Sequence, residues 1–176
     1  GRMIKFSHSL FALPFAFSGV ALAMLGTDVL PSQILWIAVA MIGARSAAMG
    51  FNRLVDRKID AANLRTAVRE LPTGTFSPGA VRIFVVFSSA VLVFAAHQLN
   101  PLCFALSPIA LTIVFFYSYT KRFTWATQFF LGLSLSVAPI GAWIAITGSL
   151  SSGILLLGAA VCLWVAGFDV IYACQD

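Results

Sequence analysis

Six long apolar stretches separated by short connections constrain the fold of this chain more than any other feature. A helix that spans a bilayer needs about 20 mostly apolar residues. Hydrophobic residues make up 60% of the 176 residues, charged ones 10%, and the mean hydropathy is +0.97, which excludes an ordinary soluble domain. We therefore predict an all-α, polytopic transmembrane helix bundle that forms one membrane-embedded domain over residues 1–176, with spans at roughly 10–27, 33–53, 80–97, 101–119, 125–147 and 151–170.

The basic residues lie on alternate connections and predict the orientation of the bundle. They precede the first span, fill the long connection 52–79 and follow the fourth span, whereas connections 28–32, 98–100 and 148–150 carry none. Because positively charged loops stay in the cytoplasm, we expect an integral protein of the bacterial inner membrane whose basic loops face the cytoplasm. The net charge of +5 reflects this topology and a local anion site, so nucleic acid is not an expected partner.

The first acidic cluster, NRLVDRKID at 52–60, places Asn52, Asp56 and Asp60 four residues apart. On a helix these side chains share one face, about 5–6 Å apart, and carboxylates that close repel each other. The basic side chains within the segment project from other faces, so a compensating cation is needed. Mg²⁺ prefers such hard oxygen ligands. The alternative is a solvated helix end with weak surface ion pairs.

A second acidic cluster, DVIYACQD at 169–176, ends the sixth span and predicts a joint site with the first. Asp169 and Asp176 are seven residues apart, two helical turns, so they also share a face. Both clusters are expected at the same membrane edge. A diphosphate held by metal on some oxygens and by basic side chains on others suits this pattern. The basic residues between the clusters are Arg65, Arg69, Lys121 and Arg122.

Arg45 lies well inside the second span, seven residues before Asn52 and so on the same helical face. An ionisable residue within a membrane span is a functional candidate by default. Arg45 can hold a substrate carboxylate or a diphosphate deeper in the cavity, or it can form a buried structural pair with one of the aspartates.

Five segments together resemble, in order, the motifs of the UbiA superfamily of intramembrane aromatic prenyltransferases. They are IKFSHSLFALPFA (4–16), NRLVDRKID (52–60), LRTAVRELPTG (64–74), YSYTKRFT (117–124) and DVIYACQD (169–176). The resemblance covers the whole chain. It implies nine transmembrane helices around a central cavity, of which six lie in this chain and the last three would follow residue 176.

The resemblance also implies an enzyme that transfers a polyprenyl group from polyprenyl diphosphate to an aromatic acceptor, with Mg²⁺ as cofactor. Matched by position, the first metal would be served by Asn52, Asp56 and Asp60, and the second by Asp169 and Asp176. Asp56 and Asp169 are the residues expected to be catalytic. Diphosphate would be contacted by Arg65, Arg69, Lys121, Arg122, Tyr117 and Tyr172, and the acceptor by Arg45. The two tyrosines can instead belong to an interfacial aromatic belt.

For the acceptor, DVIYACQD and IKFSH look most like the branch that acts on 4-hydroxybenzoate or a related aromatic acid in quinone biosynthesis. Glu70, in RELP, is similar to the menaquinone-pathway members of that branch. Enzymes similar to heme O synthase or chlorophyll synthase are the sister alternatives. A cation-coupled transporter and a non-catalytic fragment are alternatives from other classes.

Overall fold

The computed structural model describes residues 6–63, 66–68 and 71–174, which contain six α-helices and no strand. This confirms the predicted all-α fold. Helices α2 to α6 are long and apolar enough to cross a membrane, and α1 contributes a shorter apolar stretch, Leu13–Ala23. The helices are α1 (Phe6–Ala23), α2 (Pro31–Ala62), α3 (Pro78–Leu99), α4 (Pro101–Thr120), α5 (Thr127–Thr147) and α6 (Ser152–Ala173).

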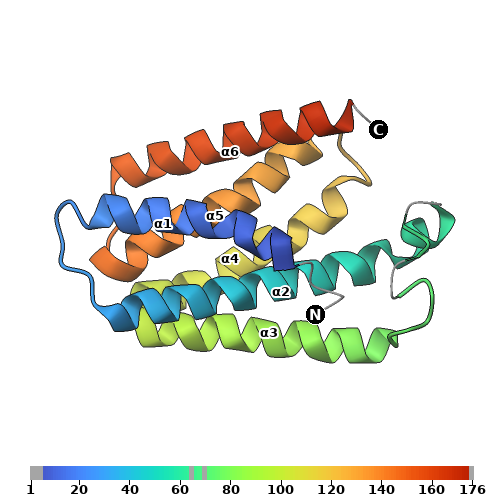
Figure 1. Cartoon of the computed structure of the whole chain (residues 1–176), viewed down its shortest axis with the longest axis horizontal. Helices are drawn as coiled ribbons and strands as arrows, with labels where there is room; N and C mark the ends of the chain where they lie inside the picture. Colours follow the sequence, from blue (N-terminus) through green and yellow to red (C-terminus); the bar gives the residue numbers. More distant parts are fainter. Residues whose placement is uncertain (1–5, 64–65, 69–70, 175–176) are drawn as a thin grey trace.

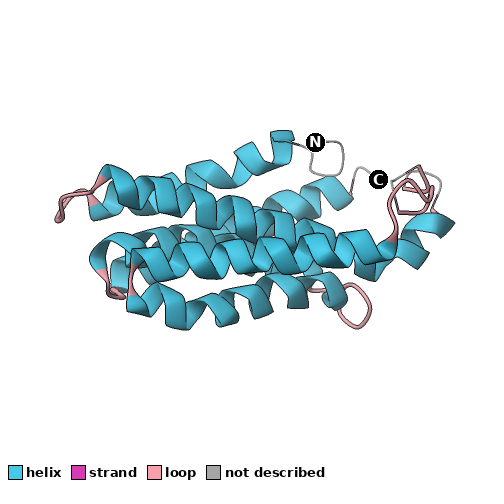
Figure 2. Ribbon diagram, turned by 90° about the horizontal axis from the view of Figure 1, so that it is seen from below, coloured by secondary structure: helices cyan, strands magenta, loops and turns pink. Residues whose placement is uncertain are grey.

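Successive helices run in opposite directions along one long axis, so alternate connections meet at the same end of the bundle (Figure 1). The loops after α2 and α4 lie at one end together with the C-terminus, and the three short connections without basic residues lie at the other. The view turned by 90° shows the same lengthwise arrangement, with the loops gathered at the two ends (Figure 2). The structure thus places the charge-rich connections on one side, as the charge pattern predicted.

Local sequence signals explain where several helices begin. Pro78 and Pro101 occupy the first turns of α3 and α4, where a missing N–H is tolerated and the fixed φ suits a helix. The residues just before them cap the helices: Ser77 Oγ accepts from Ala80 N at 3.1 Å, and Asn100 Oδ1 accepts from Cys103 N at 2.8 Å. Asn100 also donates through Nδ2 to the Ile144 carbonyl at 2.8 Å, which ties α4 to the end of α5.

Helix α5 packs against α1, α4 and α6, while α2 packs against α3 and α4. Two of these contacts are backbone to backbone. A Cβ on Gly19 would lie 2.2 Å from the Pro139 carbonyl oxygen, and one on Gly132 would lie 2.2 Å from the Cys162 carbonyl oxygen. Glycine is therefore needed where α1 crosses α5 and where α5 crosses α6.

Helix α2 is longer than the apolar pattern predicted. The second span was predicted to end near residue 53, but the helix continues to Ala62. The extra turns carry charged residues, which lower hydropathy without breaking the helix, since Arg and Lys are good helix formers and Asp is tolerated far better than Pro. As a result, Asn52, Asp56 and Asp60 all lie on one continuous helix that reaches beyond the apolar part of the bundle.

Candidate functional site

The Asp56 side chain is buried, with only 2% of its surface exposed, and two basic residues from the end of α4 approach it. Lys121 Nζ forms an ion pair with Oδ2, and Arg122 Nη2 lies 3.9 Å from Oδ1. Burying a lone carboxylate is strongly unfavourable, so Asp56 requires a cation beside it. The structure supplies that cation from Lys121, which follows α4 directly and lies 65 residues from Asp56 along the chain.

The acidic stripe of α2 faces inward. Asp60 is 6% exposed, whereas the residues between the two aspartates, Arg57, Lys58 and Ile59, are exposed. The hydroxyl of Thr66, beyond the end of α2, donates to the Asp60 carbonyl at 3.0 Å. This burial contradicts the alternative in which residues 52–60 form only a solvated helix end.

Asn52, one turn before Asp56, contacts α4. Its Nδ2 donates to Ser118 Oγ at 3.4 Å, and Ser118 is fully buried. Ser118 was not among the predicted site residues. A serine beside an aromatic residue in an apolar span carries no pattern of its own, and its role appears only once α2 and α4 are placed side by side.

Tyr117 lies near enough to both acidic motifs for their charges to act on it. Its side chain, on α4, interacts electrostatically with Asp169 of α6, with Asp56 and with Arg45 of α2. Tyr117 and Asp169 are each partly buried. The structure thus brings residues from three helices, named from separate motifs, to one region.

Arg45 lies in the middle of α2, and its Nε is buried without a hydrogen-bond partner among the described residues. The structural alternative, a buried ion pair between Arg45 and an aspartate, is not found in the described part of the chain. A buried guanidinium nitrogen with no partner is suited to bind an anionic group.

Arg122 is held by its surroundings as well as by Asp56. Its Nη2 donates to the Val55 carbonyl at 2.6 Å, and the guanidinium carbon lies 5.6 Å from the centre of the Tyr119 ring, within the range of a cation–π contact. The Tyr119 ring in turn packs edge-on against Phe51 at 5.8 Å. These contacts fix the guanidinium beside the end of α2.

One other predicted residue is exposed, and three lie outside the described residues. Tyr172 is 59% exposed, and its ring packs against Phe168 with centroids 4.9 Å apart. Arg65, Arg69 and Asp176 lie outside the described residues.

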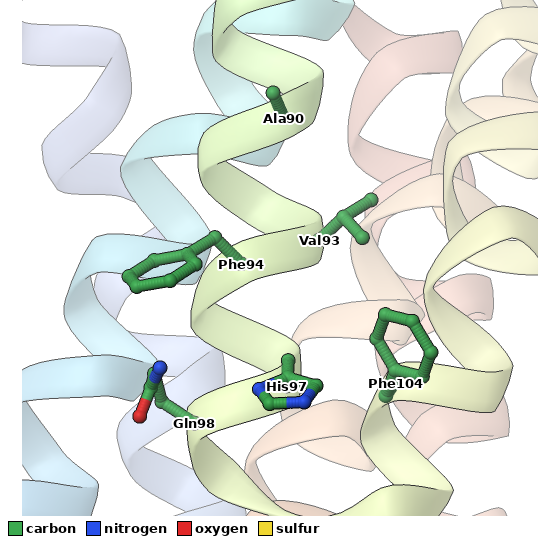
Figure 3. A pocket seen from close by; sticks show the side chains of 6 residues that line it. All are labelled: Ala90, Val93, Phe94, His97, Gln98 and Phe104. Atoms are coloured by element: carbon green, nitrogen blue, oxygen red, sulfur yellow. The ribbon is translucent and has the colours of Figure 1, made fainter.

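The charged cluster is also distinct from a shallow hollow on the outside of α3 and α4. That hollow, of about 420 Å³, is mostly apolar and contains no acidic or basic side chain other than His97, whose ring packs edge-on against Phe104 at 5.3 Å (Figure 3). It has none of the charges that the predicted chemistry needs. Its lining residues are Ala90, Val93, Phe94, His97, Gln98 and Phe104.

The cluster on α2 fits a hard divalent cation. Asp56 Oδ1 is buried and has no hydrogen-bond partner in the described residues, so one oxygen of this carboxylate can still accept a ligand. Asn52 and Asp60 add amide and carboxylate oxygens on adjacent turns, the donor types that Mg²⁺ prefers. Within the described residues, no three His, Cys, Asp or Glu side chains lie close enough together to hold a metal. A metal here would therefore be held by few protein ligands together with water and substrate oxygens, which is usual for Mg²⁺.

Comparison with known proteins agrees with these motifs. Residues 12–176 match the UbiA prenyltransferase family. A 4-hydroxybenzoate octaprenyltransferase of Vibrio atlanticus is 33% identical over 176 residues, covering 100% of this chain and 59% of that protein. One of Vibrio campbellii is 38% identical over 135 residues, covering 75% of this chain and 46% of that protein. This chain therefore spans about half to three fifths of the length of these relatives.

The fold agrees as well. The apo structure of a UbiA homolog from Aeropyrum pernix superimposes with a TM-score of 0.89 at 35% identity, covering 98% of this chain and 65% of that one. The helices that are long and apolar enough to cross a membrane mark an integral membrane protein. On the match over residues 12–176 and on this likeness of fold, the chain belongs to the UbiA prenyltransferase family.

Proposed function

We propose that this protein transfers a polyprenyl group from a polyprenyl diphosphate to the ring of an aromatic acid, with Mg²⁺ as cofactor. The observation that carries the proposal is the buried Asp56 carboxylate at the loop end of α2, faced by Lys121 and Arg122, which directly follow α4. One carboxylate that would bind a metal ion and two basic side chains that would bind a diphosphate thus lie together. The relatives named 4-hydroxybenzoate octaprenyltransferase support the reaction class.

Asn52, Asp56 and Asp60 would hold one metal ion, and Asp169 with Asp176 a second. Bound Mg²⁺ would supply Lewis-acid stabilisation of the negative charge on the leaving diphosphate. Arg65, Arg69, Lys121 and Arg122 would bind the same diphosphate oxygens through charge-assisted hydrogen bonds. The carboxylates of Asp56 and Asp169 are the groups on which transfer depends most.

The bond that breaks is the one between the allylic carbon and the diphosphate oxygen, and the electron pair leaves with diphosphate. Tyr117, on which the charges of Asp56, Asp169 and Arg45 act, would donate a hydrogen bond to the diphosphate or stabilise the allylic cation through its ring. A ring carbon of the acceptor then forms the new carbon–carbon bond, and the ring loses a proton. No protein nucleophile takes part.

Arg45 would bind the acceptor carboxylate. It lies deeper along α2 than Asp56, about three turns away at 1.5 Å per residue, and its Nε is buried without a partner in the described residues. Arg45 would then bind an anion on the apolar side of the proposed diphosphate site. An aromatic acid such as 4-hydroxybenzoate fits that arrangement better than a macrocycle, because it presents one small anionic group.

We place the protein in the bacterial inner membrane, with this site facing the cytoplasm and quinone biosynthesis as its setting. The basic connections at the end of the bundle that carries Asp56 support this orientation. The menaquinone branch rests on RELP at 69–72.

The test is a transfer assay in membranes from cells that express the chain, using labelled polyprenyl diphosphate and 4-hydroxybenzoate. We expect a prenylated product that disappears with EDTA and returns with Mg²⁺. Transfer to another aromatic acid but not to 4-hydroxybenzoate would overturn the acceptor assignment alone. No metal-dependent transfer to any aromatic acid, together with no binding of an unreactive polyprenyl thiodiphosphate, would overturn the function.

A further inference from the structure

The two cations beside Asp56 are held in different ways. Arg122 donates to the Val55 carbonyl at 2.6 Å and stacks on the Tyr119 ring, so it stays in place without Asp56. Lys121 has Asp56 as its partner among the described residues, and 39% of its side chain is exposed. A lysine ammonium on four flexible carbons can move to another anion at little cost. Lys121 is therefore the mobile cation of the pair.

A metal ion at Asp56 would compete with Lys121 for the same carboxylate. Lys121 occupies Asp56 Oδ2, whereas Oδ1 is buried and lacks a hydrogen-bond partner in the described residues. A divalent cation that binds Oδ1 would lie close to the ammonium, and the two positive charges would repel each other. Metal binding to Asp56 is opposed as long as Lys121 stays paired with Asp56, because moving the ammonium into water gives up the ion pair.

A diphosphate removes this obstacle because it offers Lys121 several anionic oxygens at the same end of α4. We propose that Lys121 couples metal binding to diphosphate binding: its ammonium neutralises Asp56 while diphosphate is absent and moves to the diphosphate when the metal takes Asp56. This inference rests on the proposed function and adds an exchange of partners to it. Because such coupling is reciprocal, the metal and the diphosphate each favour the binding of the other.

The exchange predicts effects of opposite sign for one substitution. Lys121→Gln keeps a hydrogen-bond donor for Asp56 but removes the competing charge. We expect the purified chain in detergent to bind Mn²⁺ roughly tenfold more tightly with Lys121→Gln than with Lys121 when no diphosphate is present. Binding of an unreactive polyprenyl thiodiphosphate should weaken by about tenfold in the same variant. Electron paramagnetic resonance of free Mn²⁺ gives the Mn²⁺ affinity. The Mn²⁺ bound by Asp56→Asn is subtracted, because it is not bound at Asp56.

Two further variants separate the proposal from a structural role. Lys121→Arg retains the charge and should bind Mn²⁺ like the unaltered protein. Lys58→Gln removes one exposed lysine from the opposite side of α2, and screening should hold its effect on Mn²⁺ below about twofold. Circular dichroism checks that each variant is folded, and Lys121→Met replaces Lys121→Gln if that variant does not fold.

Each result is decisive. Tighter Mn²⁺ binding with weaker thiodiphosphate binding supports the exchange. Equal or weaker Mn²⁺ binding in Lys121→Gln, or unchanged thiodiphosphate binding, overturns it. If EDTA-sensitive transfer persists in the unaltered protein, the proposed function still stands. No Mn²⁺ binding by any variant overturns the exchange together with the metal site of the proposed function.

Discussion

Replacing Gly132 by alanine should separate α5 from α6 and disturb the candidate site at a distance. A Cβ at this position would lie 2.2 Å from the Cys162 carbonyl oxygen and 2.9 Å from its carbonyl carbon. Both partners are backbone, so no side chain can rotate away, and the helices must move apart by about 1 Å to reach normal contact. Overpacking of this kind costs about 1–3 kcal/mol, from which the better helix propensity of alanine recovers up to about 1 kcal/mol.

We therefore expect Gly132→Ala to lower the free energy of unfolding by about 1–2 kcal/mol, measured as a lower midpoint in thermal unfolding followed by circular dichroism in detergent. The same shift should reduce prenyl transfer, because Cys162 lies two turns before Asp169 on α6. A displacement of 1 Å can reduce a rate by about 100-fold.

Gly141 provides the matched control on the same helix. A Cβ there meets nothing within 4 Å, so Gly141→Ala should leave stability unchanged or raise it by up to about 1 kcal/mol. The packing argument is refuted if Gly132→Ala unfolds at or above the midpoint of the unaltered protein, or if the two alanine variants are indistinguishable.

Two further substitutions test the acceptor site and the α4 cap. Arg45→Ala should raise the KM for the aromatic acid by about tenfold or more and leave thiodiphosphate binding unchanged, because it removes a charged hydrogen bond to the carboxylate. Equal loss of acceptor binding and thiodiphosphate binding would reassign Arg45 to the diphosphate. Arg82→Ala, at an exposed position, is the control. Asn100→Ala should lower the unfolding midpoint more than Ser77→Ala. Both variants lose a helix cap worth about 1 kcal/mol, but only Asn100 also donates to the Ile144 carbonyl. Equal midpoints for the two variants would contradict the role of that second hydrogen bond.

The number of helices and most of their ends follow directly from the sequence, since apolar length, proline and capping residues are local signals. Pro78 and Pro101 mark helix starts, and the predicted spans 80–97 and 101–119 lie within α3 and α4. The end of α2 at Ala62 was missed because hydropathy reports the membrane boundary and not the end of the helix.

The face of the acidic stripe was also predictable, because residues four apart on a helix must share a side, and Asp56 and Asp60 are both buried. The residue that neutralises Asp56 was not predictable. The spacing predicted a cation from outside the segment, but Lys121 lies 65 residues from Asp56, and no local pattern pairs the two. The buried contact of Asn52 with Ser118 likewise depends on how α2 packs against α4.

The most direct test of the account compares Asp56→Asn with Asp28→Asn in the membrane transfer assay. The first removes the buried carboxylate charge beside Lys121 and Arg122; the second makes the same chemical change at an exposed residue at the opposite end of the bundle. We predict that Asp56→Asn is inserted and folded but loses Mg²⁺-dependent transfer by at least about 100-fold, as expected when a charge-stabilising group is removed, while Asp28→Asn retains it. Transfer by folded Asp56→Asn at the rate of Asp28→Asn would contradict the metal and diphosphate role assigned to this site.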